Sequence, residues 1–115
     1  MSEIINLSYL KEISGGDSNF IKEMLELYIS TTATEAVLFR ELYEKKDISG
    51  IGHLAHKMKA PIQMLGATNL YNTIKTIEES CKAGINLEKL PENIELVNQL
   101  VNESVTEVKS LIDNL

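Results

Sequence analysis

The residues most able to do chemistry in this chain lie in one stretch that lacks acidic side chains. All 17 aspartates and glutamates fall within 1–47 or 78–115, so the segment 48–77 contains none. Both histidines, His53 and His56, lie in this segment together with Lys57, Lys59 and Lys75. A neutral imidazole supplies a nucleophilic nitrogen near pH 7, and ammonium groups can offset the charge of a phosphoryl group. The pattern favours chemistry on an anion, although burial of these elements would also exclude acidic residues.

The histidines are expected on a helix over about 47–65. Its apolar stripe consists of Ile51, Leu54, Ala55, Met58, Ile62 and Leu65. Beside this stripe, His56, Lys59 and Gln63 follow one another at spacings of four or three residues, and Gly52 leaves space one turn before His56. We expect the ring of His56 to be exposed with no carboxylate near it; a ring packed in the core or held by a carboxylate would argue against the chemistry.

The elements that must position these residues are also helical. Apolar residues recur at spacings of three and four, which predicts helices over about 7–13, 19–45, 47–65 and 67–83, and a last one that begins near Pro91. Asp17 or Ser18 and Asp47 are predicted caps, and Gly66 and Gly84 are predicted turns. We therefore expect an all-α fold, an antiparallel four-helix bundle with a short additional N-terminal helix, as a single domain over 1–115.

The expected second helix is continuous. Its predicted stripe is Phe20, Met24, Tyr28, Thr32, Ala36, Phe39 and Tyr43. The stripe of the last helix is Ile94, Val97, Val101, Val105, Val108 and Ile112, and that of the helix before it is Leu70, Ile74, Ile77 and Cys81. These stripes should form the core.

The composition excludes several classes of protein. A formal net charge of −6 argues against a nucleic-acid partner, which requires a basic face. No segment approaches the ~20 apolar residues that a membrane span needs, so we expect a cytoplasmic protein that does not contact membranes. Cys81 is the only cysteine, so the chain can form no internal disulfide and no multi-thiolate metal site.

The segment from Ala55 to Gly66 resembles the histidine-containing phosphotransfer (HPt) family of multistep phosphorelays. The family motif reads His-x-apolar-Lys-Gly followed by Gly six residues later, and His56, Met58, Lys59 and Gly66 match it. Downstream, Leu70, Ile74, Ile77 and Glu78 resemble the family pattern for the next helix, and the expected architecture is also similar. Two residues depart from the motif: Ala60 replaces the glycine after the lysine, and Pro61 follows and should bend the helix.

The resemblance implies roles for individual residues. His56 is the implied phosphoacceptor, Lys59 supports the phosphohistidine, and Gly66 permits close approach at the turn. Ala60 still leaves little bulk beside the phosphorylated face. A hydrogen bond from Gln63 to the phosphoryl group is our inference from the helical wheel, since the family position varies.

The resemblance also implies partners. These are receiver domains of hybrid histidine kinases and response regulators, which supply the phospho-aspartate and the Mg²⁺, so the chain itself needs no cofactor and no autokinase activity is expected. A segment without carboxylates would avoid repulsion from the acidic pocket of a receiver, with Ile48, Ile51 or the first helix adding apolar contact. A bundle with its own four-helix core is expected to be a monomer.

Two other readings remain open. In the first, the chain is a non-catalytic helical adaptor and His56 has no chemical role. In the second, His53 and His56, three residues apart, bind a metal, although no acidic residue lies nearby in sequence and two lysines would repel a cation. A conventional enzyme lacks support, because no glycine-rich phosphate loop or hydrolase motif is present. The donor, the acceptor and the direction of phosphate flow cannot be read from the sequence.

Overall fold

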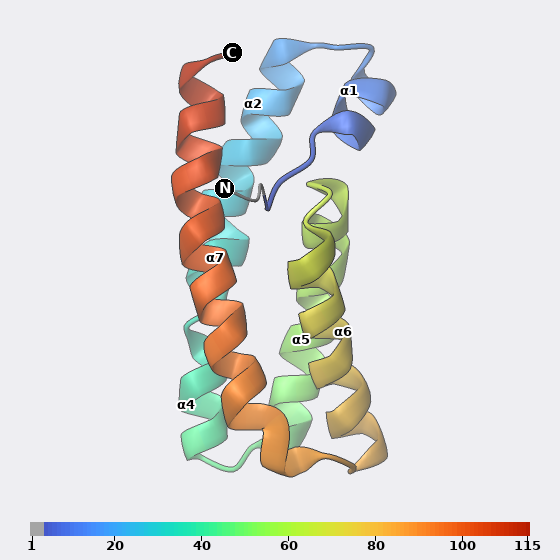
Figure 1. Cartoon of the computed structure of the whole chain (residues 1–115), viewed down its shortest axis with the longest axis vertical. Helices are drawn as coiled ribbons and strands as arrows, with labels where there is room; N and C mark the ends of the chain where they lie inside the picture. Colours follow the sequence, from blue (N-terminus) through green and yellow to red (C-terminus); the bar gives the residue numbers. More distant parts are fainter. Residues whose placement is uncertain (1–3) are drawn as a thin grey trace.

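Four long helical segments lie side by side in the computed structural model, which describes residues 4–115 (Figure 1). The elements are α1 (Ser8–Ser14), α2 (Ser18–Leu27), the π-helical turn η1 (Tyr28–Thr32), α3 (Ala33–Glu35), α4 (Leu38–Glu44), α5 (Ile48–Met64), α6 (Thr68–Ala83), the 3₁₀ turn η2 (Leu87–Lys89) and α7 (Leu90–Asp113). The first long segment of the bundle consists of α2, η1, α3 and α4 in succession. The other three are the single helices α5, α6 and α7. The predicted all-α bundle with a short extra N-terminal helix is confirmed.

The helix boundaries follow the predicted capping residues. The Asp17 carboxylate accepts hydrogen bonds from the backbone N–H groups of Asn19 and Phe20, and the Asp47 carboxylate accepts one from Gly50. Pro91 lies in the first turn of α7, where its missing N–H costs nothing. Both predicted caps and the predicted start of the last helix are therefore confirmed.

The predicted continuous helix over 19–45 is wrong in its middle. The α-helical pattern widens into the π turn η1, resumes in α3 and is interrupted again between α3 and α4. The Thr31 hydroxyl donates to the Leu27 carbonyl, and the Thr34 hydroxyl donates to the carbonyls of Ser30 and Thr31. Hydroxyls that bond to preceding carbonyls compete with the helical ladder, which accounts for the irregular turn. Apolar spacing alone does not reveal this competition.

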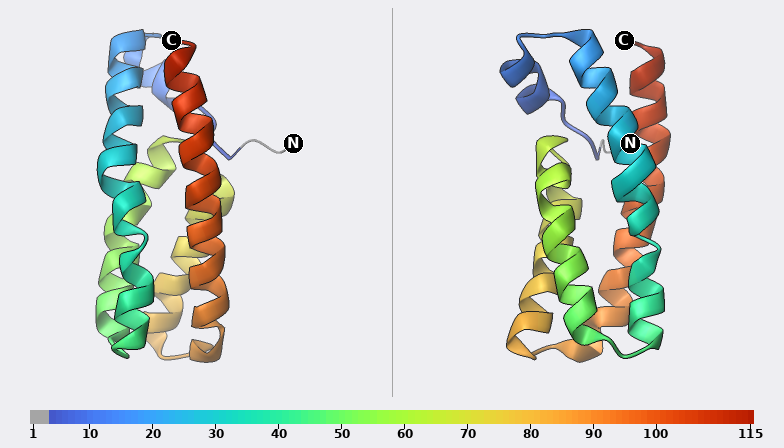
Figure 2. Two further views of the ribbon diagram at one scale, coloured as in Figure 1. Left: turned by 90° about the vertical axis from the view of Figure 1, so that its left-hand side faces the viewer. Right: turned by 180° about the vertical axis from the view of Figure 1, so that it is seen from behind.

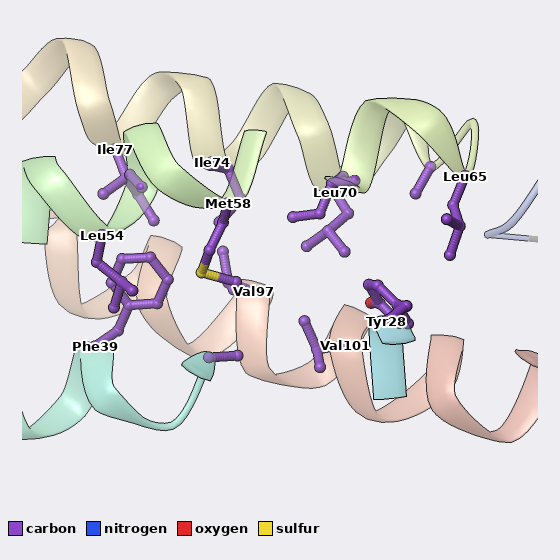
Figure 3. Packing of buried hydrophobic residues seen from close by; sticks show 14 of the residues in the cluster. Tyr28, Phe39, Leu54, Met58, Leu65, Leu70, Ile74, Ile77, Val97 and Val101 are labelled. Carbon is purple, nitrogen blue, oxygen red and sulfur yellow. The ribbon is translucent and has the colours of Figure 1, made fainter. Parts of the chain in front are cut away.

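The core contains most of the predicted stripe residues. All six residues of the predicted stripe over 47–65 are buried, as are Leu70, Ile74 and Ile77 of α6. In Figure 3, Leu54 and Met58 of α5 and Ile74 and Ile77 of α6 point toward Phe39 and Val97. The predicted burial of Tyr43 is wrong, because its side chain is 37% exposed and Leu42 packs against the core instead. Cys81, Val105 and Ile112 are only partly buried.

The N-terminal segment and α1 cover one end of the bundle. The hairpin of α5 and α6 is shorter than α7. Its closed end lies below α1 in the views of Figures 1 and 2. The Asn6 N–H donates to the Leu65 carbonyl at 2.9 Å, which joins the N-terminal segment to this turn. Gly66 has a φ of +65°, and a Cβ there would collide with the Asn6 carbonyl oxygen. The predicted close approach at Gly66 is therefore an approach of the chain's own N-terminal segment.

Helix α5 continues through Pro61 to Met64.

In the part of the chain that the structure describes, no helix is both long enough and apolar enough to cross a membrane.

Candidate functional site

His56 lies on the outer side of α5, facing α6. Its side chain is 72% exposed, and its Nδ1 is 2.6 Å from Oε2 of Glu78 on α6. The ring is therefore held at one nitrogen and open to solvent elsewhere. Within residues 4–115, no hydrogen bond involves its other nitrogen, Nε2.

The predicted absence of carboxylates around His56 is wrong. Glu78 is the first residue after the acid-free segment, and the antiparallel pairing of α5 and α6 places it against the ring. Glu35 of α3 likewise forms an ion pair with Lys57, with 2.7 Å between Oε2 and Nζ. A gap in the sequence does not produce an acid-free surface, because neighbouring helices contribute their own side chains to it.

The carboxylate contact decides which nitrogen can react. The pKa of Glu78 is lowered chiefly by its hydrogen bond to Lys59 and further by that to His56, while burial opposes the shift. An ionised Glu78 can only accept a hydrogen bond, so Nδ1 of His56 carries a proton, and in the neutral ring Nε2 then has the lone pair. A carboxylate at Nδ1 thus leaves the exposed nitrogen, Nε2, nucleophilic. A ring held by a carboxylate was expected to argue against the chemistry, but a contact at Nδ1 does not occupy Nε2.

Lys59 lies on the other oxygen of the same carboxylate. Its Nζ is 2.6 Å from Oε1 of Glu78, and its side chain is only 25% exposed. The hydrogen bond from Lys59 to Glu78 raises the pKa of Lys59, against the effect of burial. Lys59 is therefore a permanent cation that holds Glu78 ionised and in position. The Lys59 ammonium is bound to Glu78, the carboxylate that also binds His56, and does not extend freely beside the ring.

The other predicted site residues lie farther from the ring. Gln63 and Ala60 are exposed on α5, and no side-chain hydrogen bond of Gln63 is found within residues 4–115. Gln63 is two turns past His56, or ~10 Å along the helix axis. Side chains on a helix lean toward its N-terminus, so the ring leans away from Gln63. The geometry does not bring Gln63 to the site.

A cleft of about 490 Å³ lies on the N-terminal side of the ring, between α5 and α6. Its lining residues are Ser49, Gly52, His53 and His56 of α5 and Glu78, Cys81 and Lys82 of α6. A Cβ at Gly52 would lie 3.1 Å from the Cβ of Cys81, so glycine permits the close approach of the two helices at the floor of the cleft. Gly52 was expected to leave space near the ring, and it lines the cleft beside it.

Two further expectations concern the surroundings of His56. Ile51 is fully buried, so the expectation that it contacts a partner is wrong; it belongs to the core. Ile48 is partly buried, and Tyr9 and Ile13 of α1 are about half exposed. For the alternative metal site on His53 and His56, residues 4–115 contain no group of three or more histidines, cysteines or acidic residues able to hold a metal ion.

The family model of the Hpt domain matches residues 23–115. The chain belongs to the Hpt domain family. A search of curated proteins and a search of solved structures each gave no match. Hpt domains serve phosphotransfer in phosphorelays, and the helical bundle found here fits that family. The match covers His56, all of α5, α6 and α7, and the first long segment from residue 23 in α2 onward, whereas α1 lies outside it.

Sequence reasoning missed Glu78 as a site residue. From the sequence, Glu78 matches only the family pattern of the helix after the motif, which indicates no chemical role for it. A usable signal was its position 22 residues after His56, because an antiparallel hairpin that turns at Gly66 returns the chain to the level of His56 near residue 78. The cleft that His53 and Lys82 share is likewise not visible from periodicity, because it depends on the register of α5 against α6.

Proposed function

We propose that this Hpt domain carries a phosphoryl group on Nε2 of His56, accepting it from the aspartate of one receiver domain and passing it to the aspartate of another. The observation that carries this proposal is an exposed imidazole whose inner nitrogen is bound by an ionised carboxylate. That arrangement leaves one nitrogen with a lone pair directed away from Glu78. Membership of the Hpt family supports phosphotransfer as the use of this nitrogen.

The contacts among His56, Glu78 and Lys59 support the following transfer step. The lone pair of Nε2 attacks the phosphorus of the aspartyl phosphate in line, an N–P bond forms, and the P–O bond to the aspartate breaks, so the aspartate leaves as a carboxylate. The proton on Nδ1 stays in its hydrogen bond to Glu78. Positive charge that develops on the ring is then stabilised by the adjacent carboxylate, as in a triad of nucleophile, base and orienting acid.

The receiver supplies the rest of the chemistry in this proposal. Its Mg²⁺ and acidic pocket belong to the partner, and Hpt residues contribute the nucleophile and its orientation. Reversal of the same step onto a second receiver restores the neutral ring with its proton on Nδ1. Because no ATP-binding motif is found in the sequence, we propose a phosphoryl carrier, acting as a monomer, and not a kinase.

The test is transfer of label from a phosphorylated receiver domain in the presence of Mg²⁺. We expect acid-labile, base-stable label on the wild-type protein and none on His56→Gln, because glutamine cannot form an N–P bond under these conditions. His53→Gln is the matched control and should still accept label. Label that persists on His56→Gln at the wild-type level would refute the assignment.

A further inference from the structure

We propose that the N-terminal strap, residues 4–7, is a releasable latch with Glu107 of α7 as its catch. The closed latch fixes α1 and the α5–α6 hairpin in one position relative to α7, and its opening weakens the binding of receiver domains without changing the chemistry of His56. The consequence for receivers rests on the proposed function of His56. The latch itself is a property of the fold that an experiment without a receiver can test.

The catch is a carboxylate that binds two successive peptide groups. Oε1 of Glu107 accepts the N–H of Ile4 at 2.8 Å, and Oε2 accepts the N–H of Ile5 at 2.9 Å. Hydrogen bonds to an ionised acceptor are stronger than those between neutral groups. Within residues 4–115, Glu107 forms no ion pair with a lysine or arginine, so both of its oxygens serve the strap.

The strap is also a bridge between α7 and the hairpin that carries His56. Next to the two peptide groups bound by Glu107, the N–H of Asn6 donates to the Leu65 carbonyl at the end of α5. Figure 1 shows the strap between α7 and the closed end of the hairpin, before it enters α1. Within residues 4–115, the other long-range side-chain bonds of α7 reach η1 and α4, and none reaches α5 or α6 directly. The strap therefore provides the polar connection between α7 and the hairpin.

The strap and α1 are held by few buried contacts. Over residues 4–14, Ile5 and Leu10 are the only buried side chains. Helix α1 has 7 residues, too few for a stable isolated helix. A groove of about 950 Å³ lies along the strap, with the segment 103–111 of α7 as its other wall. Segments with few buried contacts open locally at a fraction of the cost of global unfolding, so the strap and α1 can detach together.

The position of α1 affects a partner that docks over His56. A stable interface buries ~800 Å² on each partner and involves about 20 residues, so it extends well beyond a single side chain. The end of α5 at Met64 is ~12 Å along the helix axis from His56. Beyond it, α1 presents the half-exposed side chains of Tyr9 and Ile13. A receiver centred on His56 therefore reaches α1, and its affinity depends on α1 being held in place.

The reacting group is insulated from the latch. His56 and Lys59 both bond to Glu78, and all three residues belong to the hairpin. Release of the strap frees the hairpin as a unit and leaves these bonds intact. A change confined to receiver affinity is therefore the signature of the latch, whereas general damage to the fold would also slow the chemistry.

The first experiment follows amide hydrogen exchange in wild type, Glu107→Gln and Glu107→Ala. Glutamine keeps one acceptor and places a donor against the other N–H, whereas alanine removes both acceptors. We expect exchange at residues 4–6 to accelerate by about threefold to tenfold in Glu107→Gln and by about tenfold to a hundredfold in Glu107→Ala.

The control for this experiment lies on the same groove. Glu103→Gln, one turn earlier on α7, should exchange like wild type, because Glu103 makes no bond to the strap. The amides of Ile74 and Val101 report global unfolding from the core and should not change. Unchanged exchange at residues 4–6 in both Glu107 variants, or equal acceleration throughout the core, would overturn the latch.

The second experiment measures single-turnover transfer from a phosphorylated receiver at increasing concentrations of the Hpt protein. Because only the closed form binds with full affinity, the apparent dissociation constant rises as the closed fraction falls. We expect Glu107→Ala to need about threefold more protein for the half-maximal rate, with an unchanged maximal rate. Its labelling by phosphoramidate, a donor that needs no receiver, should equal that of wild type. An unchanged half-maximal concentration, or slower labelling by phosphoramidate, would contradict the proposal.

The two experiments separate failure of this inference from failure of the proposed function. A wild-type protein that accepts phosphate from no receiver overturns the proposed function, and hydrogen exchange then still decides for or against the latch. A protein that exchanges phosphate with receivers while its Glu107 variants behave like wild type in both measurements retains the relay and loses the latch.

Discussion

Glu78 binds His56 and Lys59 at the same time, with one carboxylate oxygen for each. Both contacts measure 2.6 Å, and they connect residues three positions apart on α5 to one residue on α6. The carboxylate fixes the proton on Nδ1, and Lys59 keeps the carboxylate charged. At the scale of single residues, the contact at Nδ1 is therefore the reason for which we propose Nε2 as the reacting nitrogen.

Replacement of Glu78 by Gln should slow phosphoryl transfer without preventing it. The amide cannot stabilise positive charge on the ring, and it allows either ring nitrogen to carry the proton. We expect a loss of about tenfold in the rate of transfer from a phosphorylated receiver. Rapid-quench measurements would determine this rate, and Lys59→Ala should show a smaller loss in the same direction. An unchanged rate in Glu78→Gln would mean that the hydrogen bond does not orient the nucleophile.

The same ion pair predicts a pH dependence of folding stability. The pKa of Glu78 is lowered below its ordinary value of 4.5, so its contribution is present above that pH and is lost as the pH falls through the lowered value. The pKa of Lys59 is raised above 10.5, so its contribution is present below that pH and is lost as the pH rises through the raised value.

Thermal unfolding of wild type and Glu78→Gln across this range would measure the effect. The variant should lose stability less steeply in acid, although some acid dependence should remain, because the Arg40 guanidinium also lowers the pKa of Glu95. Above pH 10.5 the variant should likewise fall less steeply. Identical pH profiles would mean that the pair contributes nothing to folding.

At the scale of elements, the hairpin of α5 and α6 is the unit that assembles the site. Within residues 4–115, the two residues bonded to Glu78 and all residues that line the cleft belong to these two helices. Their mutual position depends on the turn at Gly66, which is in turn packed against Asn6 and bonded through Leu65. The N-terminal segment thus supports the closed end of the hairpin from outside the region that matches the family.

Gly66→Ala should destabilise the protein more than Gly84→Ala. Both glycines have positive φ, so each alanine suffers a strain of ~1 kcal/mol, but only at Gly66 would the added Cβ collide with another backbone segment. We expect a total of about 2–3 kcal/mol at Gly66, measured by urea denaturation. Amide exchange at Asn6 should accelerate in Gly66→Ala alone. Equal costs at the two positions would show that the N-terminal segment does not constrain the turn.

At the scale of the whole molecule, the bundle is joined by a shared core and by few long-range polar contacts. Tyr28 of η1 bonds through its hydroxyl to the Ser104 hydroxyl of α7 at 2.6 Å, and both groups are buried. Ser104 also donates to the Val101 carbonyl, so the Tyr28 hydroxyl is the donor of the shared bond. The Arg40–Glu95 ion pair joins α4 to α7 on the exposed surface, where such pairs contribute little.

Tyr28→Phe should lower stability by ~1 kcal/mol, or about 4 °C in Tm, because the buried Ser104 oxygen loses its donor. Burial raises the pKa of Tyr28 above 10.0, so folding keeps the phenol neutral, and this contribution is lost as the pH rises through the raised value. The variant should therefore show a shallower loss of stability in alkali. Tyr43→Phe, at an exposed position, is the control and should change neither quantity.

The sequence by itself determined the helices, most of their buried faces and the exposure of His56. These properties depend on spacing along one chain segment and on capping residues a few positions away, which local physical chemistry controls. The π turn at Tyr28–Thr32 was missed because hydroxyl competition is not visible in apolar periodicity.

Only the tertiary structure decided what surrounds His56. Glu78 is 22 residues away in sequence, and its contact depends on the register of two antiparallel helices set by the turn at Gly66. The cleft with Lys82, and the commitment of Lys59 to Glu78, follow from the same register. Helical periodicity tells which residues share a face, but not which residues of another helix lie opposite that face, because packing between helices determines that choice.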